Sequence, residues 1–514
     1  MMKIVRDEEW HAQLVEALET KKTYHTWTLF QMQYQLTKRL LIPSFTGLQS
    51  LAYLPDLQPF KHQIEAAETV IEKMNGKAIL ADEVGLGKTI EAGLILKEYM
   101  IRGLVQKAII LAPASLVNQW VEELRGKFHL PATAYRKNMS LSSLQIVVMS
   151  IDMAKRSPHK EQILAENYDL IIIDEAHKLK NARTQNYQFV QQLKKKFCLL
   201  LTATPIQNNV FELYHLISLL KPGHLGNYKS FQAMFKTAKE HEEAEHFIHE
   251  LVNQVMVRNQ RKDTEIDWTS RHVQVVPIQF SLEERTVYEQ MISLQGHVKQ
   301  LDNAFTMLTL QKELCSSKEA TALTLMRLKE KCRDPEEKVQ LEKTIAAVMR
   351  LTYNAKAEKV YELIQQHEGK VLIFTEYEAS QLYLQSFLMK RGITSVPFNG
   401  RFSKSKRDWM KQLFKEKAQV LIATESGSEG INLQFCHTVI NYDLPWNPMK
   451  LEQRIGRVHR IGQTEQVHVY NLVVKETIED HILHVLYEKI GLFENVIGEL
   501  DDILSKVNKK IIHE

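Results

Sequence analysis

The sequence has little cysteine, little net charge and no long apolar run, and each shortage narrows the class of protein. Its four cysteines lie far apart, in no spacing typical of a paired metal site. They are Cys198, Cys315, Cys332 and Cys436. No segment approaches the roughly 20 apolar residues that a membrane helix needs. The N-terminal stretch MMKIVRDEEW carries acidic residues and lacks the apolar core of a secretory signal. We therefore expect a protein of the reducing cytoplasm with no membrane partner.

The charges of the chain nearly cancel. It has 66 lysines and arginines against 62 acidic residues, a formal net charge of +4. This balance does not by itself indicate a nucleic-acid partner, although a local basic cleft could lie within it. A chain of 514 residues is too long for a single core. Its length predicts about three to four domain-sized units.

Glycine is also scarce, but two glycines lie close together in LADEVGLGKTIEAG, Leu80 to Gly93. The run KAILA before them predicts a buried strand, and IEAGLILKEYM after them has helical spacing. A glycine-containing turn between a strand and a helix is typical of a phosphate-binding loop, in which backbone N–H groups attract the anion. Lys88 would reach the β- and γ-phosphates, and the Thr89 hydroxyl would bind Mg²⁺. The common pattern has glycine where this chain has Asp82, so a plain strand–helix turn is the alternative.

A second motif favours the phosphate-binding interpretation. In YDLIIIDEAHKLK, the apolar run Leu170 to Ile173 predicts a buried strand, and Asp174 and Glu175 stand at its C-terminal end. Ligands of open parallel sheets bind at that edge. Asp174 would hold Mg²⁺, and Glu175 would orient or deprotonate the attacking water. The alternative is a solvated acidic strand end, but two such motifs in this order favour the site.

Buried strands alternate with helical patterns up to Pro222 and predict a parallel, doubly wound sheet. From 221 to 263 the pattern is helical and charged, with no buried strand predicted. The apolar stripe from Val287 to Leu308 predicts one long helix. Strand patterns resume in KVLIFTEYE and QVLIATESGSEG. They predict a second α/β lobe, about 356–475, without a phosphate loop of its own.

A cluster of cations lies late in this second lobe, in QRIGRVHRIGQ. Arg454, Arg457 and Arg460 are spaced by threes, which predicts that they share one helix face and repel one another. A structural role would need acidic partners, and the stretch itself has none. A polyanion across an interface accounts for the cluster better. The arginines could be fingers that reach a γ-phosphate held by the first lobe.

Together these motifs resemble those of the SWI/SNF-type superfamily-two helicase-like ATPases, the double-stranded DNA translocases. Seven stretches match in order over about residues 56–500: PFKHQ, DEVGLGKT, LAPASLVNQW, DEAH, LTATPIQN, ATESGSEGINLQ and QRIGRVHRIGQ. The form of the phosphate loop and the absence of a chromatin-reading module resemble the bacterial branch, which includes an RNA-polymerase-associated protein. The resemblance implies an α/β fold with two RecA-like parallel-sheet lobes, helical insertions and a helical C-terminal segment. It also implies ATP and Mg²⁺ as cofactors and a bacterial cytoplasm or nucleoid as the location.

The resemblance also implies roles for individual residues. Catalytic roles fall to Lys88, Glu175, Arg457 and Arg460. Thr89 and Asp174 are the expected metal ligands. The residues expected to bind the nucleotide are Gln63, Asp82, Glu83, Val84, Gly85, Leu86, Gly87, Lys88, Thr89 and Gly430, with Gln63 aligned to an adenine-reading glutamine. The residues expected to couple hydrolysis to movement are His177, Thr202, Thr204 and Gln453.

The function expected is a DNA-stimulated ATPase that translocates on double-stranded DNA and remodels or displaces bound protein complexes, without processive strand separation. Two alternatives stay open. One is a strand-separating DNA or RNA helicase, and the other is an ATP-gated remodelling factor that binds RNA polymerase. The expected partners are double-stranded DNA and either RNA polymerase or another DNA-bound complex, and we expect a monomer.

The predicted domains are an N-terminal extension of unknown role (1–55), the first RecA-like lobe (56–221), a helical insertion that returns to that lobe (222–275), a helical protrusion and linker (276–355), the second RecA-like lobe (356–475) and a C-terminal helical brace (476–514).

Overall fold

The computed structural model describes residue 27 and residues 30–34, 47–137, 139–203, 205, 211–238, 250–428 and 431–497. The chain divides into two compact units, Met1–Gly47 and Leu48–Glu514. In the first unit, residues 30–34 are helical. Most of the predicted extension 1–55 lies outside the described residues.

The second unit begins with a short helix that packs on the first lobe. This helix is η1 (Gln49–Tyr53). The backbone N–H groups of Gln49 and Ser50 donate to the carboxylate of the buried Glu98, at 3.1 and 2.7 Å. The last part of the predicted extension is therefore part of the first lobe.

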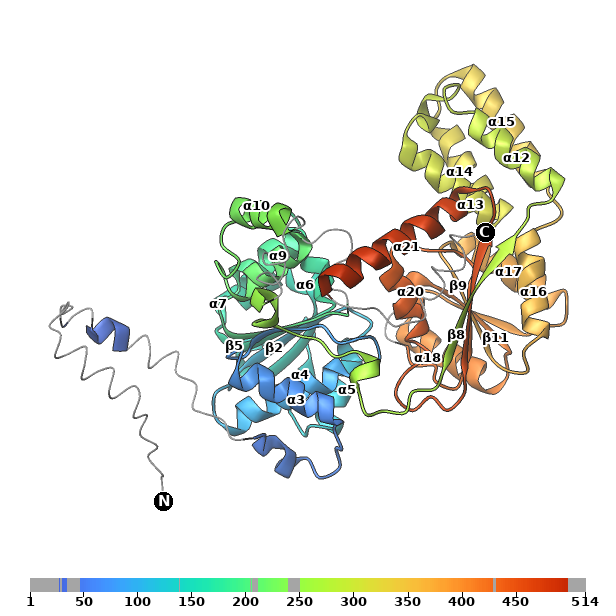
Figure 1. Cartoon of the computed structure of the whole chain (residues 1–514). Helices are drawn as coiled ribbons and strands as arrows, with labels where there is room; N and C mark the ends of the chain where they lie inside the picture. Colours follow the sequence, from blue (N-terminus) through green and yellow to red (C-terminus); the bar gives the residue numbers. More distant parts are fainter. Residues whose placement is uncertain are drawn as a thin grey trace. The chain divides into compact units, whose positions relative to one another are not determined.

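The first lobe is built on a parallel sheet, which within the described residues has seven strands in the order β3-β4-β2-β5-β6-β1-β7 (Figure 1). They are β1 (Lys77–Leu80), β2 (Ala108–Ala112), β3 (Ala132–Ala134), β4 (Ile146–Ser150), β5 (Tyr168–Asp174), β6 (Lys195–Leu201) and β7 (Met256–Val257). The central strands are apolar on both faces because helices cover both sides of a parallel sheet. Leu201 of β6 is in register with both Leu80 and Asp174. The loops that follow β1, β5 and β6 therefore leave the same edge of the sheet.

The helices of the first lobe follow the predicted alternation with strands. They are α3 (Lys61–Glu72), α4 (Lys88–Ile101), α5 (Val117–Gly126), α6 (Ile151–Ala154), α7 (His159–Ala165), α8 (Gln185–Gln192), α9 (Phe211–Leu220) and α10 (Tyr228–Ala238), with the 3-10 turns η2 (Leu141–Ser143) and η3 (Ala176–Leu179). The prediction of no buried strand between 221 and 263 is wrong, since β7, whose Met256 is buried, pairs with β1 at the sheet edge. A strand of two residues is too short to show a period in the sequence.

The second lobe has its own parallel sheet, with six strands among the described residues in the order β10-β11-β9-β12-β13-β8. They are β8 (Arg271–Ile278), β9 (Val371–Thr375), β10 (Ser395–Phe398), β11 (Val420–Thr424), β12 (Thr438–Asn441) and β13 (Val467–Val474). β8 pairs with β13 along its whole length. This edge strand lies outside the range 356–475 predicted for the second lobe, because the chain crosses between the lobes before the helical protrusion and not after it.

Helices flank the second sheet and form a protrusion from it (Figure 1). The protrusion contains α12 (Leu282–Ser293), η5 (Lys299–Leu301), α13 (Ala304–Ser316), α14 (Lys318–Lys331) and α15 (Pro335–Arg350). The lobe itself carries α16 (Ala355–Gln365), α17 (Glu378–Met389), α18 (Lys404–Glu416), α19 (Glu425–Ser428), α20 (Pro448–Ile455) and α21 (Ile478–Ile497). Within the described residues, no helix combines the length and apolarity that crossing a membrane requires.

The prediction of one long helix from Val287 to Leu308 is wrong. α12 ends at Ser293, Gly296 has a φ of 84°, and α13 begins only at Ala304. A left-handed residue cannot continue an α-helix. The apolar stripe marks burial instead, since most of its members are buried in the protrusion.

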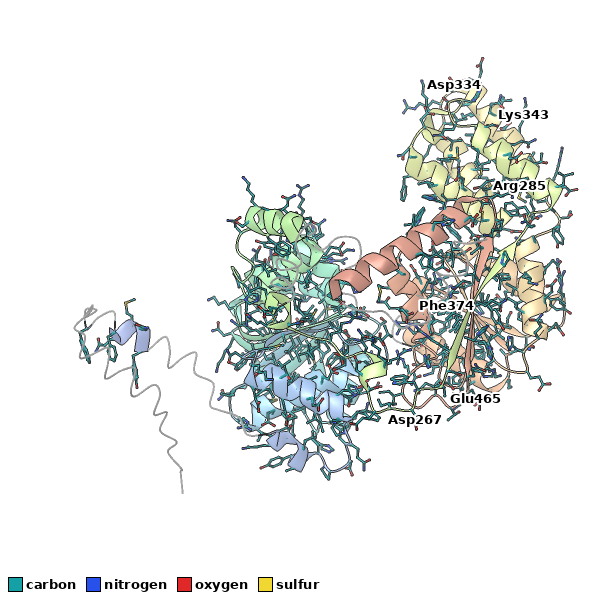
Figure 2. The ribbon with its side chains drawn as sticks, in the orientation of Figure 1. Asp267, Arg285, Asp334, Lys343, Phe374 and Glu465 are labelled. Carbon is teal, nitrogen blue, oxygen red and sulfur yellow. The ribbon has the colours of Figure 1, made fainter. Side chains whose placement is uncertain are left out.

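The core of the protrusion is continuous with the core of the second lobe. Buried residues of α12 and α13, among them Met291 and Leu310, belong to the same apolar cluster as Val371 and Ile373 of β9. Phe374 of the same strand, labelled in Figure 2, belongs to a separate apolar cluster of the second lobe. We infer that the protrusion and the second lobe move as one body, because separating them would expose this shared core.

Candidate active site

The loop between β1 and α4, residues 81–87, has the conformation of an anion-binding turn. Gly85 and Gly87 have φ angles of 98° and 95°. The left-handed φ favours glycine at position 87, and a Cβ there would also lie 2.4 Å from the side-chain nitrogen of Gln63, which would have to move. Lys88 begins α4, and its ammonium donates to the carbonyl oxygens of Asp82 and Glu83 at 2.6 and 3.1 Å. The loop thus presents a cation at the N-terminus of a helix.

Asp174 ends β5 at the same sheet edge and is held by two donors. The indole N–H of Trp120 donates to its Oδ2 at 2.9 Å, and the backbone N–H of Glu175 donates to its Oδ1 at 2.8 Å. Burial, and then the charge of Glu175, raise the pKa of Asp174 to about 6. A carboxylate in such a position is stabilised by a nearby cation.

Glu175 follows in the left-handed region, with a φ of 52°. This conformation is uncommon for a residue with a side chain and is found where a site requires it. Burial opposes ionisation of the carboxyl, but His177, Arg457 and Lys88 outweigh it and lower the pKa to about 2. The Nδ1 atom of His177 lies 3.1 Å from Glu175 Oε2. Glu175 is therefore an ionised acceptor, as orientation or deprotonation of a water molecule demands.

One cavity of about 240 Å³ brings the predicted residues of both lobes together. Its lining from the first lobe includes Val84, Gly85, Gly87, Lys88, Thr89, Asp174, Glu175 and Thr202, and from the second lobe Gln453, Arg457 and Arg460. Burial, and then the charge of Arg457, lower the pKa of Arg460 to about 10. Two cations held close together in a buried cavity indicate an anionic ligand.

The residues of this cavity fit a nucleoside triphosphate and a divalent cation. Lys88, Arg457 and Arg460 supply positive charge for the phosphates, and the Thr89 hydroxyl and the Asp174 carboxylate are the oxygen ligands that Mg²⁺ prefers. The raised pKa of Asp174 shows that its charged form is unfavourable here without a cation. A bound cation would stabilise the charged carboxylate and lower this pKa.

Three loop residues predicted to bind the nucleotide do not belong to the cavity lining. Asp82 is buried and accepts from the backbone and side-chain nitrogens of Asn259, at 2.8 and 3.0 Å. Glu83 accepts from the backbone N–H of Arg261 at 3.1 Å, and Leu86 is fully buried. The side chains of Asp82 and Glu83 thus bind the segment that follows β7.

Gln63 also contacts the loop. Its side-chain nitrogen donates to Leu86 O at 2.8 Å, and its side-chain oxygen accepts from the backbone N–H of Phe60 at 3.1 Å. Both ends of the amide are therefore used within the protein. Adenine recognition by Gln63 stays a prediction.

The predicted helix face of three arginines is wrong. α20 ends at Ile455, so only Arg454 lies on a helix. Arg454 is buried and structural: it lies 3.4 Å from Glu425 Oε1 and donates to the carbonyl oxygen of Asp443 at 2.7 Å. Its acidic partner comes from α19, far away in the sequence, which is why the local sequence showed none.

The residues expected to couple hydrolysis to movement lie around the same cavity where they are described. Thr202 and Gln453 line it, and His177 contacts Glu175. Gln453 also lines a neighbouring cavity of about 500 Å³. Thr204 and Gly430 lie outside the described residues.

Sequence reasoning did not identify the contribution of α5. Gln119, Trp120 and Glu123 of α5 line the cavity, as does Lys127 directly after it. The only signal was the match of LAPASLVNQW to a family motif, which carried no assigned role. Trp120 is the clearest case, because its hydrogen bond orients the predicted metal ligand Asp174.

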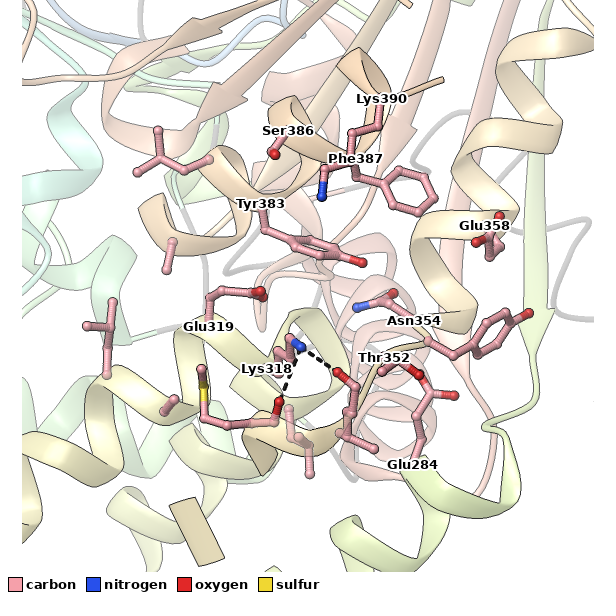
Figure 3. Close-up of a pocket in the computed structure, with 18 of the residues that line it drawn as sticks. Glu284, Lys318, Glu319, Thr352, Asn354, Glu358, Tyr383, Ser386, Phe387 and Lys390 are labelled. Carbon is pink, nitrogen blue, oxygen red and sulfur yellow. Dashed lines mark hydrogen bonds between the residues drawn. The ribbon is translucent and has the colours of Figure 1, made fainter. Parts of the chain in front are cut away.

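A larger cavity, of about 760 Å³, lies where the protrusion meets the second lobe (Figure 3). Two of its charged side chains bind backbone groups of the protein. The ammonium of Lys318 donates to the carbonyl oxygens of Met349 and Leu351. Glu284 accepts from the backbone N–H groups of Ser281 and Ala355. The smaller cavity gathers the predicted residues of both lobes and is the candidate active site.

The fold and the cavity define a class, the two-lobed helicase-like nucleotide hydrolases. Comparison with known proteins agrees. Residues 62–337 match the family model of the SNF2-related domain, and residues 355–462 match the helicase conserved C-terminal domain.

Two relatives in sequence extend this agreement. An uncharacterized ATP-dependent helicase, YqhH of Bacillus subtilis (strain 168), is 54% identical over 507 residues, which cover 98% of this chain and 91% of that protein. The RNA polymerase-associated protein RapA of Actinobacillus pleuropneumoniae serotype 3 (strain JL03) is 29% identical over 489 residues. That match covers 84% of this chain and 50% of RapA, so the chain spans about half the length of this relative. Among solved structures, the Sulfolobus solfataricus SWI2/SNF2 ATPase core in complex with dsDNA is similar at 23% identity and a TM-score of 0.41, over 92% of this chain and 97% of that one.

The chain belongs to the SNF2-related family of helicase-like ATPases, and it is an ATP hydrolase. The family resemblance and the fold class predicted from the sequence are confirmed.

Proposed function

We propose that the protein is a DNA-stimulated ATPase that translocates on double-stranded DNA and remodels or displaces bound protein complexes, without processive strand separation. The observation that carries this proposal is the composition of the nucleotide cavity, whose lining comes from both lobes. Each lobe alone holds an incomplete site. Hydrolysis therefore depends on how the lobes meet, and a polymer bound across both can control it.

Each lobe supplies a different part of the chemistry. Lys88 of the first lobe binds the phosphates, and the Glu175 carboxylate orients the attacking water. Arg457 and Arg460 of the second lobe stabilise the charge that develops in the transition state. Mg²⁺ held by Thr89 and Asp174 would neutralise charge on the phosphates.

The neighbouring cavity supports coupling of hydrolysis to movement. This cavity of about 500 Å³ shares Glu175, Gln453 and Arg457 with the nucleotide cavity. Lys178 and Lys450 also line it, one from each lobe. A strand that changes the separation of the lobes would move residues common to both cavities.

Contact with the strand would be made mainly to phosphates. The helix α18 carries Lys406 and Lys415 exposed to solvent, and Arg401 lies just before it. Cations in such a row attract a polyanion without selecting a sequence. The protrusion favours the proposal of a duplex substrate over that of a single strand, because a rigid extension of the lobe can brace a duplex.

The partner of the motor is also a proposal. RapA is by its name associated with RNA polymerase. We extend this to RNA polymerase or another DNA-bound complex as the target, in a bacterial cytoplasm or nucleoid. We also propose a monomer, because one chain supplies both halves of the cavity.

The test is the ATPase rate with duplex DNA, single-stranded DNA, RNA or no nucleic acid. The proposal expects the highest rate with duplex DNA and a steep loss of stimulation as salt rises, because binding releases counterions. Stronger stimulation by single strands or RNA would favour a strand-separating helicase. A slow rate that no nucleic acid changes would favour a factor gated by ATP and directed to RNA polymerase alone.

A further inference from the structure

The segment between β7 and β8, residues 258–270, crosses from the first lobe to the second (Figure 2 marks Asp267 within it). Arg261 of this segment is buried and binds both lobes. Its Nη2 donates to Val84 O of the phosphate loop at 2.8 Å and to His459 O at 3.2 Å. Its Nη1 lies 2.7 Å from His459 Nδ1. One guanidinium thus joins the phosphate loop to the segment that carries the predicted arginine fingers.

His459 is fixed in a form suited to this contact. Its Nε2 lies 2.9 Å from Thr269 O, a carbonyl that can only accept, so the proton belongs on Nε2. Its Nδ1 is then the acceptor for Arg261. Burial, and then the charges of Arg261 and Arg271, lower the pKa of His459 to about 4, which keeps the ring neutral. His459 lies between Arg457 and Arg460 in the sequence, so holding its ring in place restricts the positions of both arginines.

Trp268, on the same segment, completes the arrangement. The Arg261 guanidinium lies 4.8 Å from the centre of the Trp268 ring, and that ring meets His459 edge to face at 5.6 Å. Stacking on an aromatic face and a planar fork of donors are properties of arginine that lysine lacks. The contact therefore depends on geometry as well as on charge.

The surfaces that Arg261 joins are in direct contact. A Cβ on Gly85 would lie 3.4 Å from His459 O, and a Cβ on Gly456 would lie 2.2 Å from Val84 Cγ1. At this separation, a small displacement of one surface moves the fingers relative to the phosphate site. A group that binds both surfaces can therefore set the rate of reaction without touching the nucleotide.

We propose that Arg261 is a positioning residue: by binding Val84 O and His459 together, it places Arg457 and Arg460 against the phosphate loop. This inference rests on the finger roles in the proposed function. Arg261 does not belong to the lining of the nucleotide cavity, so its effect passes through the residues it holds. Because it lies on the crossing segment, it also makes finger placement depend on the connection between the lobes.

The experiment compares Arg261→Ala, Arg261→Lys and the control Lys262→Ala, an exposed neighbour on the same turn η4 (Arg261–Asp263). Basal kcat and KM are measured without nucleic acid, with binding of a fluorescent ATP analogue and a thermal melt beside them. We expect Arg261→Ala to lower kcat roughly 10- to 100-fold, the effect of a misplacement of about 1 Å. KM and analogue binding should change less than about threefold, because binding and chemistry respond separately. Lys262→Ala should match the wild type.

Arg261→Lys distinguishes the effect of the side-chain geometry from the effect of its charge. It also replaces the alanine variant if that variant does not fold. A kcat as low as that of the alanine variant supports positioning, because lysine keeps the charge but lacks the fork. A wild-type kcat in Arg261→Lys would overturn it.

The double variant Arg261→Ala/Arg460→Ala tests whether the two residues act together. If Arg261 acts through the fingers, adding its loss to Arg460→Ala should lower kcat less than about threefold further, a non-additive result. Independent, multiplied losses would overturn the inference, as would a loss of analogue binding equal to the loss of kcat. Failure of the proposed function looks different. A wild type whose ATPase ignores DNA would contradict translocation, while the basal kcat values would still decide the role of Arg261.

Discussion

Gly456→Ala should disable the enzyme without unfolding it. Gly456 has φ and ψ of −64° and −4°, an ordinary helical conformation, so an alanine there strains no backbone. The added Cβ would instead lie 2.2 Å from Val84 Cγ1 and 3.0 Å from Val84 Cβ, across the boundary between the lobes. Rotation of the valine alone does not clear both atoms.

The size of the effect follows from these distances. Carbon atoms in ordinary contact lie about 3.5–4.0 Å apart, so the two surfaces must separate by roughly 0.5–1 Å to clear Val84 Cβ even if the valine rotates, and by roughly 1.5 Å if it does not. A misplacement of about 1 Å costs roughly 100-fold in rate, or about 3 kcal/mol in the barrier. We expect kcat to fall by about this factor while ATP binding changes little, since Lys88 stays in the first lobe.

Steady-state ATPase kinetics and a thermal melt measure both quantities. Gly126→Ala is the matched control, because a Cβ there meets no atom within 4 Å. Val84→Ala removes Cγ1, the atom in the closer conflict, and leaves only Cβ at 3.0 Å, so Gly456→Ala/Val84→Ala should recover part of the rate of Val84→Ala alone. An unchanged kcat in Gly456→Ala, or no recovery in the double variant, would refute a catalytic state in which these surfaces touch.

Three further predictions concern the site itself. Lys88→Ala should lower kcat by about 10³-fold or more with a normal melting profile, because the phosphates lose their ammonium; an unchanged rate would remove the phosphate-loop assignment. Glu175→Gln should bind ATP but hydrolyse it very slowly and trap the DNA-bound state; a variant that bound neither ATP nor DNA more tightly than the wild type would contradict this. Arg457→Ala and Arg460→Ala should each lower kcat by roughly 10³-fold with little loss of ATP binding, as fingers do; equal losses of binding and rate would indicate structural arginines.

The parts of the fold and site that local sequence encodes could be predicted. The buried strand before Asp174 and the strand–glycine–helix pattern around Lys88 fix both groups at one sheet edge. The structure then places Arg457 and Arg460 in the same cavity, as the resemblance implied.

Features that depend on distant segments could not be predicted. The sequence grouped Arg454 with the possible arginine fingers, but in the structure it pairs with Glu425 on another helix. Arg261 sits in a charged stretch without a motif, and its role emerges only when Val84 and His459 meet around it. The apolar stripe from Val287 continues across the turn at Gly296, so it did not predict that turn. Apolar spacing indicates which residues are buried and does not by itself indicate where a helix ends.

The central claim is movement along duplex DNA without strand separation, and paired displacement assays test it most directly. One substrate carries a triplex-forming third strand on a duplex, and the other is a plain duplex with a single-stranded tail, both at the same ATP concentration, with Glu175→Gln as the hydrolysis-deficient control. We predict ATP-dependent displacement of the third strand and no unwinding of the tailed duplex. Efficient unwinding of the tailed duplex without displacement of the third strand would contradict the claim and make the protein a strand-separating helicase.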